Sequence, residues 1–514
     1  MKKIVGPLSK QLNDILKKDL NNTEFLEEEL ETILSLRLSK RDLPYLDYFK
    51  ELEELELDSF PSVNNEDILF IGQKVPNLRS LKIKEQNALF LLNLSLFKNL
   101  EELCLIHNDN LLDIVGIEKI KRFTFYDNKD YANVRQIVDL LLANEGIIVT
   151  LDITYYVSIV NILYDLKIDV SLLDRFTWIE SIGLRKYNTY EYSNSEIDSL
   201  LKHVSYIASR YVYSTDNDLM KFCVLYTWVI NNMKFVNEDD PEGENLSLIS
   251  NVNKVFSYGR GGRLSLAKAF QMLLSFVGIK SSVVYSMGAT DVIGYFNGEK
   301  VCSLLGESDY AVLRVTLDNK DYYCDIAWDT LINFHGFFDQ LRFFLFSKNE
   351  LKTRHKFVGE GNIENTYSYH GDDCDDLIKS AKERIKEVDE IFEDIERLKP
   401  DITGKELNIA ILKLKINDIK NELDKLEINS EDYKKKMLEL TDLEEQIDSI
   451  STELVRLENN REGIIRSYSN LLLDRYMNKE KNLSKQEMLD ILEKKERILL
   501  ISEYIAELLK ECIK

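Results

Sequence analysis

The stretch between residues 259 and 280 has the layout in which several enzyme folds present a nucleophile. It reads GRGGRLSLAKAFQMLLSFVGIK, a glycine-rich turn followed by the pattern of a buried amphipathic helix. A thiolate at such a helix start is stabilised by the helix dipole. The residue at this start is Arg263, whose guanidinium stays protonated and has no lone pair with which to attack. The sequence therefore predicts the scaffold for a nucleophile without the nucleophile.

This stretch and two others resemble the transglutaminase-like superfamily, the papain-related fold of transglutaminases and bacterial cysteine hydrolases. The matching segments are TDNDLMKFCVLYTWVINNMKF (215–235), similar to the family's helix with a Tyr-x-Trp-Ile-x-x-Asn core; residues 259–280, with its Ala-Lys-Ala-Phe; and YAVLRVTLDNKDYYCDIAWD (310–329), similar to its strand pair ending Val-Asp-Val-Thr-Trp-Asp. The resemblance implies a papain-like α+β domain over residues 205–372.

The resemblance also implies which residues stand where the family has its catalytic triad. Counting without gaps places Arg263 at the cysteine, Tyr310 at the histidine and Asp325 at the acid. The family's cysteine needs an imidazole to take its proton and an acid to orient that imidazole, and a tyrosine, with an ordinary pKa of about 10, is a poor base. We therefore expect no catalytic residues. Arg263 is expected to pair with Asp325 or stack on Tyr310, or else to be a neutral surface replacement.

Two other residues are candidates for a non-standard nucleophile. Ser265 lies two residues beyond Arg263, about 200° around a helix, and so should face elsewhere. Cys324 precedes Asp325 on a predicted strand and should point to the opposite face. Both positions are more typical of core or capping residues. They keep open an alternative function, that of a cysteine-protease-like or transglutaminase-like hydrolase or acyltransferase.

The N-terminal region repeats the pattern L-x-x-L-x-L, as in LEELEL from Leu52, LRSLKI from Leu78 and LEELCL from Leu100. This pattern resembles the leucine-rich-repeat family over about residues 25–155, and it implies a solenoid over residues 1–155 whose apolar residues form the core. The x positions should face its concave side, where they either bind a partner or are ordinary solvated residues. They include Arg37, Glu54, Glu56, Arg79, Lys82, Glu102 and Arg122.

The C-terminal region, residues 373–514, has the heptad spacing of a coiled coil. Leu412, Ile416, Ile419, Leu423 and Leu426 form one seam, and Leu443, Ile447, Ile450, Leu454 and Leu457 form a second. The EINSEDY stretch between them, with Ser430 as a helix cap, favours an antiparallel hairpin. A capping box at residues 484–487 predicts a final helix. Residues 156–204 are expected to form a helical junction.

Composition limits the classes of function. The 514-residue chain is long enough for about three domains, so we expect a multidomain α/β and α protein. Its net charge of −23 argues against nucleic-acid binding. No signal peptide or membrane-spanning run is visible, which predicts a cytoplasmic protein without a membrane partner. The six cysteines and five histidines show no metal-ligand spacing, and we expect neither a metal nor a cofactor.

Together these patterns favour a non-enzymatic interaction or scaffold protein built on a catalytically dead transglutaminase-like domain. The repeats and the helical tail are modules of the kind that bind proteins. The expected partner is a protein or peptide, and the C-terminal helices are a second candidate surface, for self-association.

Overall fold

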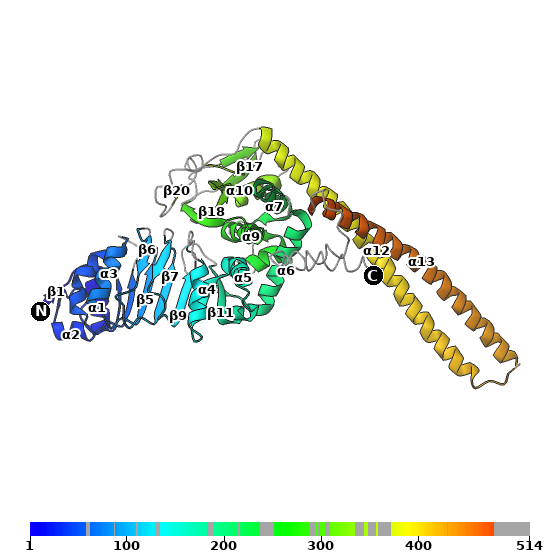
Figure 1. The fold of residues 1–514 in the computed structure, drawn as a ribbon, viewed down its shortest axis with the longest axis horizontal. Coiled ribbons are helices and arrows are strands. Elements are labelled where there is room, and N and C mark those ends of the chain that lie inside the picture. The colour runs from blue at the N-terminus through cyan, green and yellow to red at the C-terminus, as the bar shows by residue number, and fades with distance from the viewer. Residues whose placement is uncertain are drawn as a thin grey trace. The chain divides into compact units, whose positions relative to one another are not determined.

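The computed structural model of the chain divides into two compact units (Figure 1). Unit 1 comprises residues 1–205 and 225–376, and unit 2 comprises residues 206–224 and 377–514. The architecture is mixed α/β with a large helical C-terminal region, as the sequence predicts at this level. The structure describes residues 1–57, 62–86, 88–108, 111–126, 128, 134–181, 189–213, 216–236, 251–287, 293–296, 299–303, 309–334, 344–347, 356–357, 372–428 and 430–476.

Unit 1 begins with an eight-stranded sheet in the order β12-β11-β10-β9-β7-β5-β4-β3. The strands are β3 (Ser35–Leu38), β4 (Glu54–Leu57), β5 (Ser80–Lys84), β7 (Glu102–Ile106), β9 (Arg122–Tyr126), β10 (Ile148–Asp152), β11 (Phe176–Ser181) and β12 (Thr189–Glu191). They pair in parallel from β3 to β11, and β12 is antiparallel to β11.

The alternating pattern of these strands sends their leucines to one side of the sheet. Leu55, Leu81 and Leu103 are registered neighbours, and none is more than 2% exposed. The prediction that these three leucines lie in one core is confirmed. Their burial is the main source of stability here, at about 25 cal/mol per Å² of apolar surface removed from water.

Buried amides close the turns that follow three of the strands. Asn128 donates from Nδ2 to the carbonyls of Leu105 and Tyr126, each at 2.9 Å, and its Oδ1 accepts from the backbone N–H of Asn108 at 2.8 Å. Asn108 does the same one strand earlier, where its Oδ1 accepts from the N–H of Gln86 at 3.2 Å. This ladder satisfies backbone groups that burial would otherwise leave without partners.

Short elements and helices connect the strands of this sheet. They are β1 (Lys2–Lys3), α1 (Pro7–Leu16), β2 (Glu24–Phe25), α2 (Glu27–Glu31), η1 (Lys40–Tyr48), α3 (Asn65–Lys74), β6 (Leu91–Asn93), β8 (Asp113–Val115), α4 (Val134–Ala143), η2 (Ile153–Tyr155), α5 (Tyr156–Asp165) and η3 (Val170–Arg175). The sheet continues past residue 155, because β11 and β12 lie within the segment expected to be a helical junction. FTWIES is rich in the aromatic and β-branched residues that favour strands, but the helix α5 before it hides the continuity.

The rest of unit 1 builds a second sheet, in the order β19-β18-β15-β20, with α9 packed against β15 and β18. The elements of this part and its approaches are α6 (Asn194–Tyr211), α7 (Asp218–Asn232), β13 (Lys234–Phe235), α8 (Val252–Tyr258), β14 (Arg260–Gly261), α9 (Arg263–Phe276), β15 (Ser281–Met287), β16 (Ile293–Phe296), β17 (Glu299–Ser303), β18 (Asp309–Leu317), β19 (Lys320–Cys324), α10 (Ile326–Phe334) and β20 (Lys356–Phe357). All pairs in the second sheet are antiparallel.

Unit 2 contains the end of α6, the start of α7 and, from residue 377 onward, two long helices, α12 (Asp372–Leu423) and α13 (Glu431–Tyr476). Ile416, Ile419 and Leu423 pack with Leu440 in one cluster, joined by Leu443 and Ile447. The contact that the sequence predicts between the two seams is therefore present within one chain. Ser430 Oγ accepts from the N–H of Tyr433 at 3.1 Å, so the predicted cap is also confirmed.

The predicted final helix from Ser484 lies outside the described residues. Among the helices that are described, none combines the length and the apolar character needed to cross a bilayer.

Candidate functional site

The turn before α9 depends on glycines with two different roles. Gly259 ends α8 in the left-handed region, at φ +62°, a conformation that glycine adopts without strain. A Cβ on Gly261 would come within 2.7 Å of Val255 Cγ2 and 2.9 Å of Ser265 Oγ, so a larger residue would push α8 and α9 apart. The sequence pattern of a tight turn entering a helix is confirmed, with Gly262 as the residue before the first turn.

Arg263 is the first residue of α9 and is half-buried. Its guanidinium carbon lies 5.6 Å from the centroid of the Phe235 ring, which is cation–π distance. Phe235, on β13, is a contact that the sequence analysis did not anticipate. Of the two partners that it did anticipate, Tyr310 lies on β18 opposite Ser286, and its side chain is outside the described part.

Asp325, which the sequence resemblance aligned with the family's acid, follows β19 and is 1% exposed. Its Oδ1 accepts from the backbone N–H of Trp328 at 3.1 Å, which caps the first turn of α10. A carboxylate at a helix start is also favoured by the helix dipole. The position that resembles a catalytic acid thus has a structural function in this chain.

The two candidate replacement nucleophiles are both held in the structure. Ser265 is 4% exposed, and its Oγ donates to the Gly262 carbonyl at 3.2 Å. Cys324 is fully buried, and burial, followed by the charges of Asp325 and Asp329, raises the pKa of its thiol well above the ordinary value. A protonated, buried thiol is a poor nucleophile.

Charged side chains of the first sheet gather on the side opposite the leucines, which we call the polar face: Arg37, Glu54, Glu56, Lys82, Lys84, Glu102 and Arg122. Glu56 is its centre, with Lys84 Nζ at 2.7 Å, Arg37 Nε at 3.4 Å and Lys82 Nζ at 3.7 Å. Arg122 pairs with Glu102 at 2.7 Å. Arg79 is exposed just before β5.

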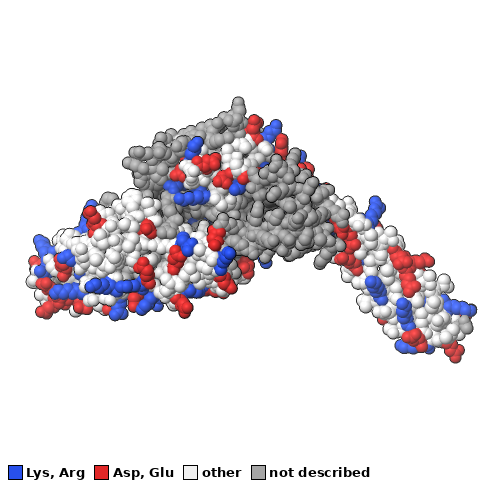
Figure 2. Space-filling model, viewed as in Figure 1, with Lys and Arg blue, Asp and Glu red and all other residues white. Residues whose placement is uncertain are grey.

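The electrostatics of Glu56 follow from these neighbours. Partial burial by itself would raise the pKa of its carboxyl, but the hydrogen bond from Lys84 and the charges of Lys84, Lys82 and Arg37 outweigh that effect and lower it. Glu56 is therefore firmly ionised at neutral pH. In Figure 2, acidic and basic side chains are interspersed in the same way over the visible surface.

A buried polar cluster joins the end of the first sheet to α9, and sequence reasoning missed it. Lys268 is 2% exposed; its Nζ lies 3.3 Å from Asp152 Oδ2 and donates to the Ser181 carbonyl at 3.2 Å. Glu180 lies in the same cluster and is fully buried. Its Oε2 accepts from the Tyr192 hydroxyl and, at 3.0 Å, from the backbone N–H of Val252.

The remaining oxygen of Glu180, Oε1, has no hydrogen-bond partner among the described residues. Burial raises the pKa of Glu180 to about 7, although the charge of Lys268 and the hydrogen bonds from Tyr192 and Val252 act in the opposite direction. One lysine is thus shared by two buried acids. The signals available in the sequence were single charged residues within apolar strands, Asp152 in IVTLDI and Glu180 in FTWIES.

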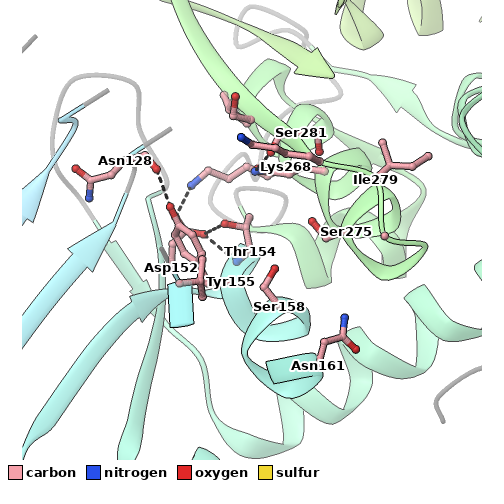
Figure 3. Close-up of a pocket in the computed structure, with 16 residues that line it drawn as sticks. Asn128, Asp152, Thr154, Tyr155, Ser158, Asn161, Lys268, Ser275, Ile279 and Ser281 are labelled. Atoms are coloured by element: carbon pink, nitrogen blue, oxygen red, sulfur yellow. Dashed lines mark hydrogen bonds and ion pairs between the residues drawn. The ribbon is translucent and has the colours of Figure 1, made fainter. Parts of the chain in front are cut away.

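A pocket of about 370 Å³ lies beside this cluster, between the end of the first sheet, α5, α9 and the start of β15. Asp152 and Lys268 stand at one end of it, with Tyr155, whose hydroxyl donates to the Asn128 carbonyl at 2.6 Å. Figure 3 shows these groups, together with the hydroxyl and amide side chains that line the remaining wall.

Comparisons with known proteins give little beyond this geometry. No protein-family model matches the sequence, and no curated protein matches it. Among solved structures, the chain is similar to a candidate cysteine protease from Cytophaga hutchinsonii, with 12% identity and a TM-score of 0.18 over 26% of this chain and 43% of that one. It is also similar to a candidate protease from Parabacteroides distasonis, with 17% identity and a TM-score of 0.18 over 26% and 27%. The chain therefore spans less than half the length of either neighbour, and likeness of this degree carries no functional argument.

Proposed function

We propose that the chain is a non-enzymatic interaction protein that binds a protein or peptide partner across the polar face of its first sheet. In this proposal, residues 1–155 are degenerate leucine-rich repeats, residues 205–372 are a transglutaminase-like domain that lacks the catalytic cysteine and histidine, and residues 373–514 contain a coiled-coil hairpin. The observation that carries the proposal is the row of charged, solvent-accessible side chains on neighbouring parallel strands.

The geometry of the polar face supports recognition. Side chains in register on neighbouring strands recur about every 4.8 Å, and here they change sign from Arg37 to Glu56 to Lys82. The side chains of Arg37 and Arg122 are 54% and 67% exposed. A partner with the complementary sequence of charges gains specificity and a faster association rate from this arrangement.

The non-enzymatic part of the proposal is supported by the state of each candidate reactive group. Arg263 cannot attack a carbonyl. Asp325 caps α10, Ser265 is bonded within its own turn, and Cys324 is a buried thiol with a raised pKa.

Charge reversal tests the polar face. The triple variant Arg37→Glu/Lys82→Glu/Arg122→Glu breaks exposed ion pairs that are each worth about 0.2–1 kcal/mol, so the fold should survive. Lys386→Glu/Arg397→Glu/Lys399→Glu is the matched control: it makes the same change in net charge and breaks exposed ion pairs on α12. The immobilised full-length chains are compared by quantitative mass spectrometry of the proteins that they retain.

We expect at least one protein to be retained by the wild type and by the control variant and to be depleted about tenfold with the polar-face variant, as the loss of roughly 1.4 kcal/mol of binding energy requires. Identical sets of retained proteins would contradict the proposal. For the enzymatic alternative, rapid labelling of one cysteine by a thiol-reactive probe at neutral pH would reveal a low-pKa thiolate. We expect slow labelling.

We also propose self-association through α12, because this helix has an exposed apolar stripe. Leu407, Ile411 and Leu414 are 61%, 43% and 67% exposed at i, i+4, i+7 spacing. A second copy of the chain would cover these side chains and remove their apolar surface from water.

Charge insertion tests this arrangement. Leu407→Glu or Leu414→Glu should weaken the dimer in sedimentation velocity, because each places a charge in the apolar contact, and Leu438→Glu, at an exposed position on α13, is the control. A monomeric wild type, or stripe variants that associate as well as the control, would contradict this proposal.

A further inference from the structure

The geometry points to the pocket beside Lys268 as a binding site for an uncharged, polyhydroxylated small molecule, the class that includes monosaccharides and cyclic polyols. This inference is independent of the protein partner proposed above, because the pocket lies beyond the paired charges of the polar face. Its volume of about 370 Å³ falls within the usual range for small-molecule sites, about 300–1,000 Å³.

The charges in the pocket favour a neutral ligand. Asp152 and Lys268 are each almost completely buried and lie 3.3 Å apart, so at this end of the pocket the two charges offset each other. Glu180, the second acid that shares Lys268, does not line the pocket. Asp152 is further occupied by Thr154, whose N–H and hydroxyl both donate to Oδ1. Lys280 is the other charged residue in the wall, and it is exposed at the rim, where water screens it.

The other polar groups in the wall match hydroxyls. Ser158 and Asn161 come from α5, and Ser275 and Ser281 come from the end of α9 and the start of β15 (Figure 3). A serine hydroxyl both donates and accepts, and an asparagine amide has one group of each kind. A ligand hydroxyl has the same dual capacity, so it can pair with any of these side chains.

One of these hydroxyls is left without a partner by the fold itself. Ser281 Oγ is buried and makes no hydrogen bond within the described part of the chain. Its backbone carbonyl is held by Gln271 Nε2 at 3.0 Å, which fixes the position of the residue at the pocket wall. A buried polar atom without a partner costs free energy, and rotation of the Ser281 side chain into the pocket would let a ligand hydroxyl supply the missing bond.

The site is also well supported by rigid elements. Its walls come from a helix on each side and from the first residues of a paired strand, and side chains on such elements are held more accurately than side chains on loops. Ser281 and Ser282 are paired with Val315 and Arg314 of β18. The pocket is therefore largely formed before a ligand arrives, which keeps the entropic cost of binding low.

Binding is tested on the full chain by ligand-observed NMR and titration calorimetry. The probes are D-glucose, N-acetylglucosamine and myo-inositol, each up to about 10 mM, a concentration that nearly saturates a site with a Kd of about 1 mM. The comparators are glucose 6-phosphate, which adds two negative charges, and glycine, which is a zwitterion.

The variants are Asn161→Leu and Ser281→Val, which remove polar groups from the wall, and Ser275→Phe, which fills the cavity. Asp165→Asn, at the exposed end of α5, is the control.

We expect saturable binding of at least one neutral probe. Asn161→Leu and Ser281→Val should each weaken it by about threefold to tenfold, Ser275→Phe should abolish it, and Asp165→Asn should leave it unchanged. The inference is overturned if no neutral probe saturates, if the charged comparators bind more tightly than all neutral probes, or if Ser275→Phe binds as well as the wild type while its thermal unfolding shows a folded chain.

Discussion

Two glutamates of unit 1, each close to a lysine, have pKa values shifted in opposite directions. Glu56 on the polar face has a lowered pKa, and Glu180 in the buried cluster has a pKa raised to about 7. Glu56 has three cations within 4 Å and remains accessible to water. Glu180 is fully buried and shares the single Lys268 with Asp152. Solvent and the balance of charges, rather than proximity to a lysine, decide the outcome.

This difference separates the contributions of the two regions. On the polar face the ion pairs remain in contact with water and are individually weak, so they are available for exchange with the charges of a partner. In the buried cluster every missing partner is costly, because no water replaces it. The first arrangement suits recognition, and the second fixes α9 against the first sheet, where it shapes the pocket.

The largest effect is expected from Lys268→Met. It leaves Asp152 and Glu180 buried without a cation, and removing one member of a buried ion pair costs about 3–5 kcal/mol. The free energy of unfolding is measured in urea by tryptophan fluorescence. This signal reports on unit 1 because the three tryptophans, Trp178, Trp228 and Trp328, all lie within it.

A compensating variant checks the cause. Lys268→Met/Asp152→Asn removes one of the uncompensated charges and keeps an acceptor for Thr154, so it should recover part of the loss. If the single variant costs less than about 1 kcal/mol, then the cluster is hydrated and the contrast with the polar face fails.

The second largest effect is the pH dependence of Glu180→Gln. The pKa of Glu180 is raised from 4.5 to about 7 in the folded state, so between these values the folded chain holds a proton that the unfolded chain has lost. The stability of the wild type should therefore fall, relative to that of the variant, by about 3 kcal/mol as the pH rises from about 4.5 to about 7. Unfolding curves across this pH range measure the difference. A constant difference would show that Glu180 is ionised throughout.

The third largest effect on stability is expected at Asp325, a buried acid that accepts a hydrogen bond from the backbone N–H of Trp328. Asp325→Ala removes the cap of α10 and should cost about 0.5–2 kcal/mol, whereas Asp325→Asn keeps the accepting oxygen and should cost less. The free energies of unfolding of both variants are measured in urea by tryptophan fluorescence. Equal losses in the two variants would mean that the fold uses the negative charge of Asp325 and not its capping oxygen.

The parts that sequence reasoning predicted correctly depend on local periodicity. Leu55, Leu81 and Leu103 recur in one short pattern. Ser430 accepts a hydrogen bond from the N–H of a residue only three positions further along the chain. In both cases the residues that determine the local structure are close in sequence. The extension of the first sheet through β11 was missed because one strand lies between helical patterns.

The buried cluster and the pocket could not be predicted in this way. Asp152 and Lys268 are 116 residues apart, and Lys268 lies in the Ala-Lys-Ala-Phe pattern of a helix, where a lysine usually faces solvent. Nor could the pairing of Arg263 be settled from the sequence. Phe235, whose ring its guanidinium approaches, belongs to a two-residue strand with no pattern of its own.

The smallest effect is expected from Glu56→Gln. Although three cations surround this carboxylate, exposed pairs are worth about 0.2–1 kcal/mol, and salt reduces that further. Because the pKa of Glu56 is lowered in the folded state, its contribution is present above the unfolded pKa of about 4.5 and is lost as the pH falls through the folded value. This direction is opposite to that of Glu180.

Glu54→Gln, at an exposed position on the same strand, is the control and should change stability less. Urea unfolding at low and at high salt, at pH 7 and at pH 3, measures both. A loss above about 2 kcal/mol that persists at high salt would show that Glu56 forms a structural ion pair. The contributions of Glu56 and Glu180 to stability would then be of similar size and differ only in how they change with pH.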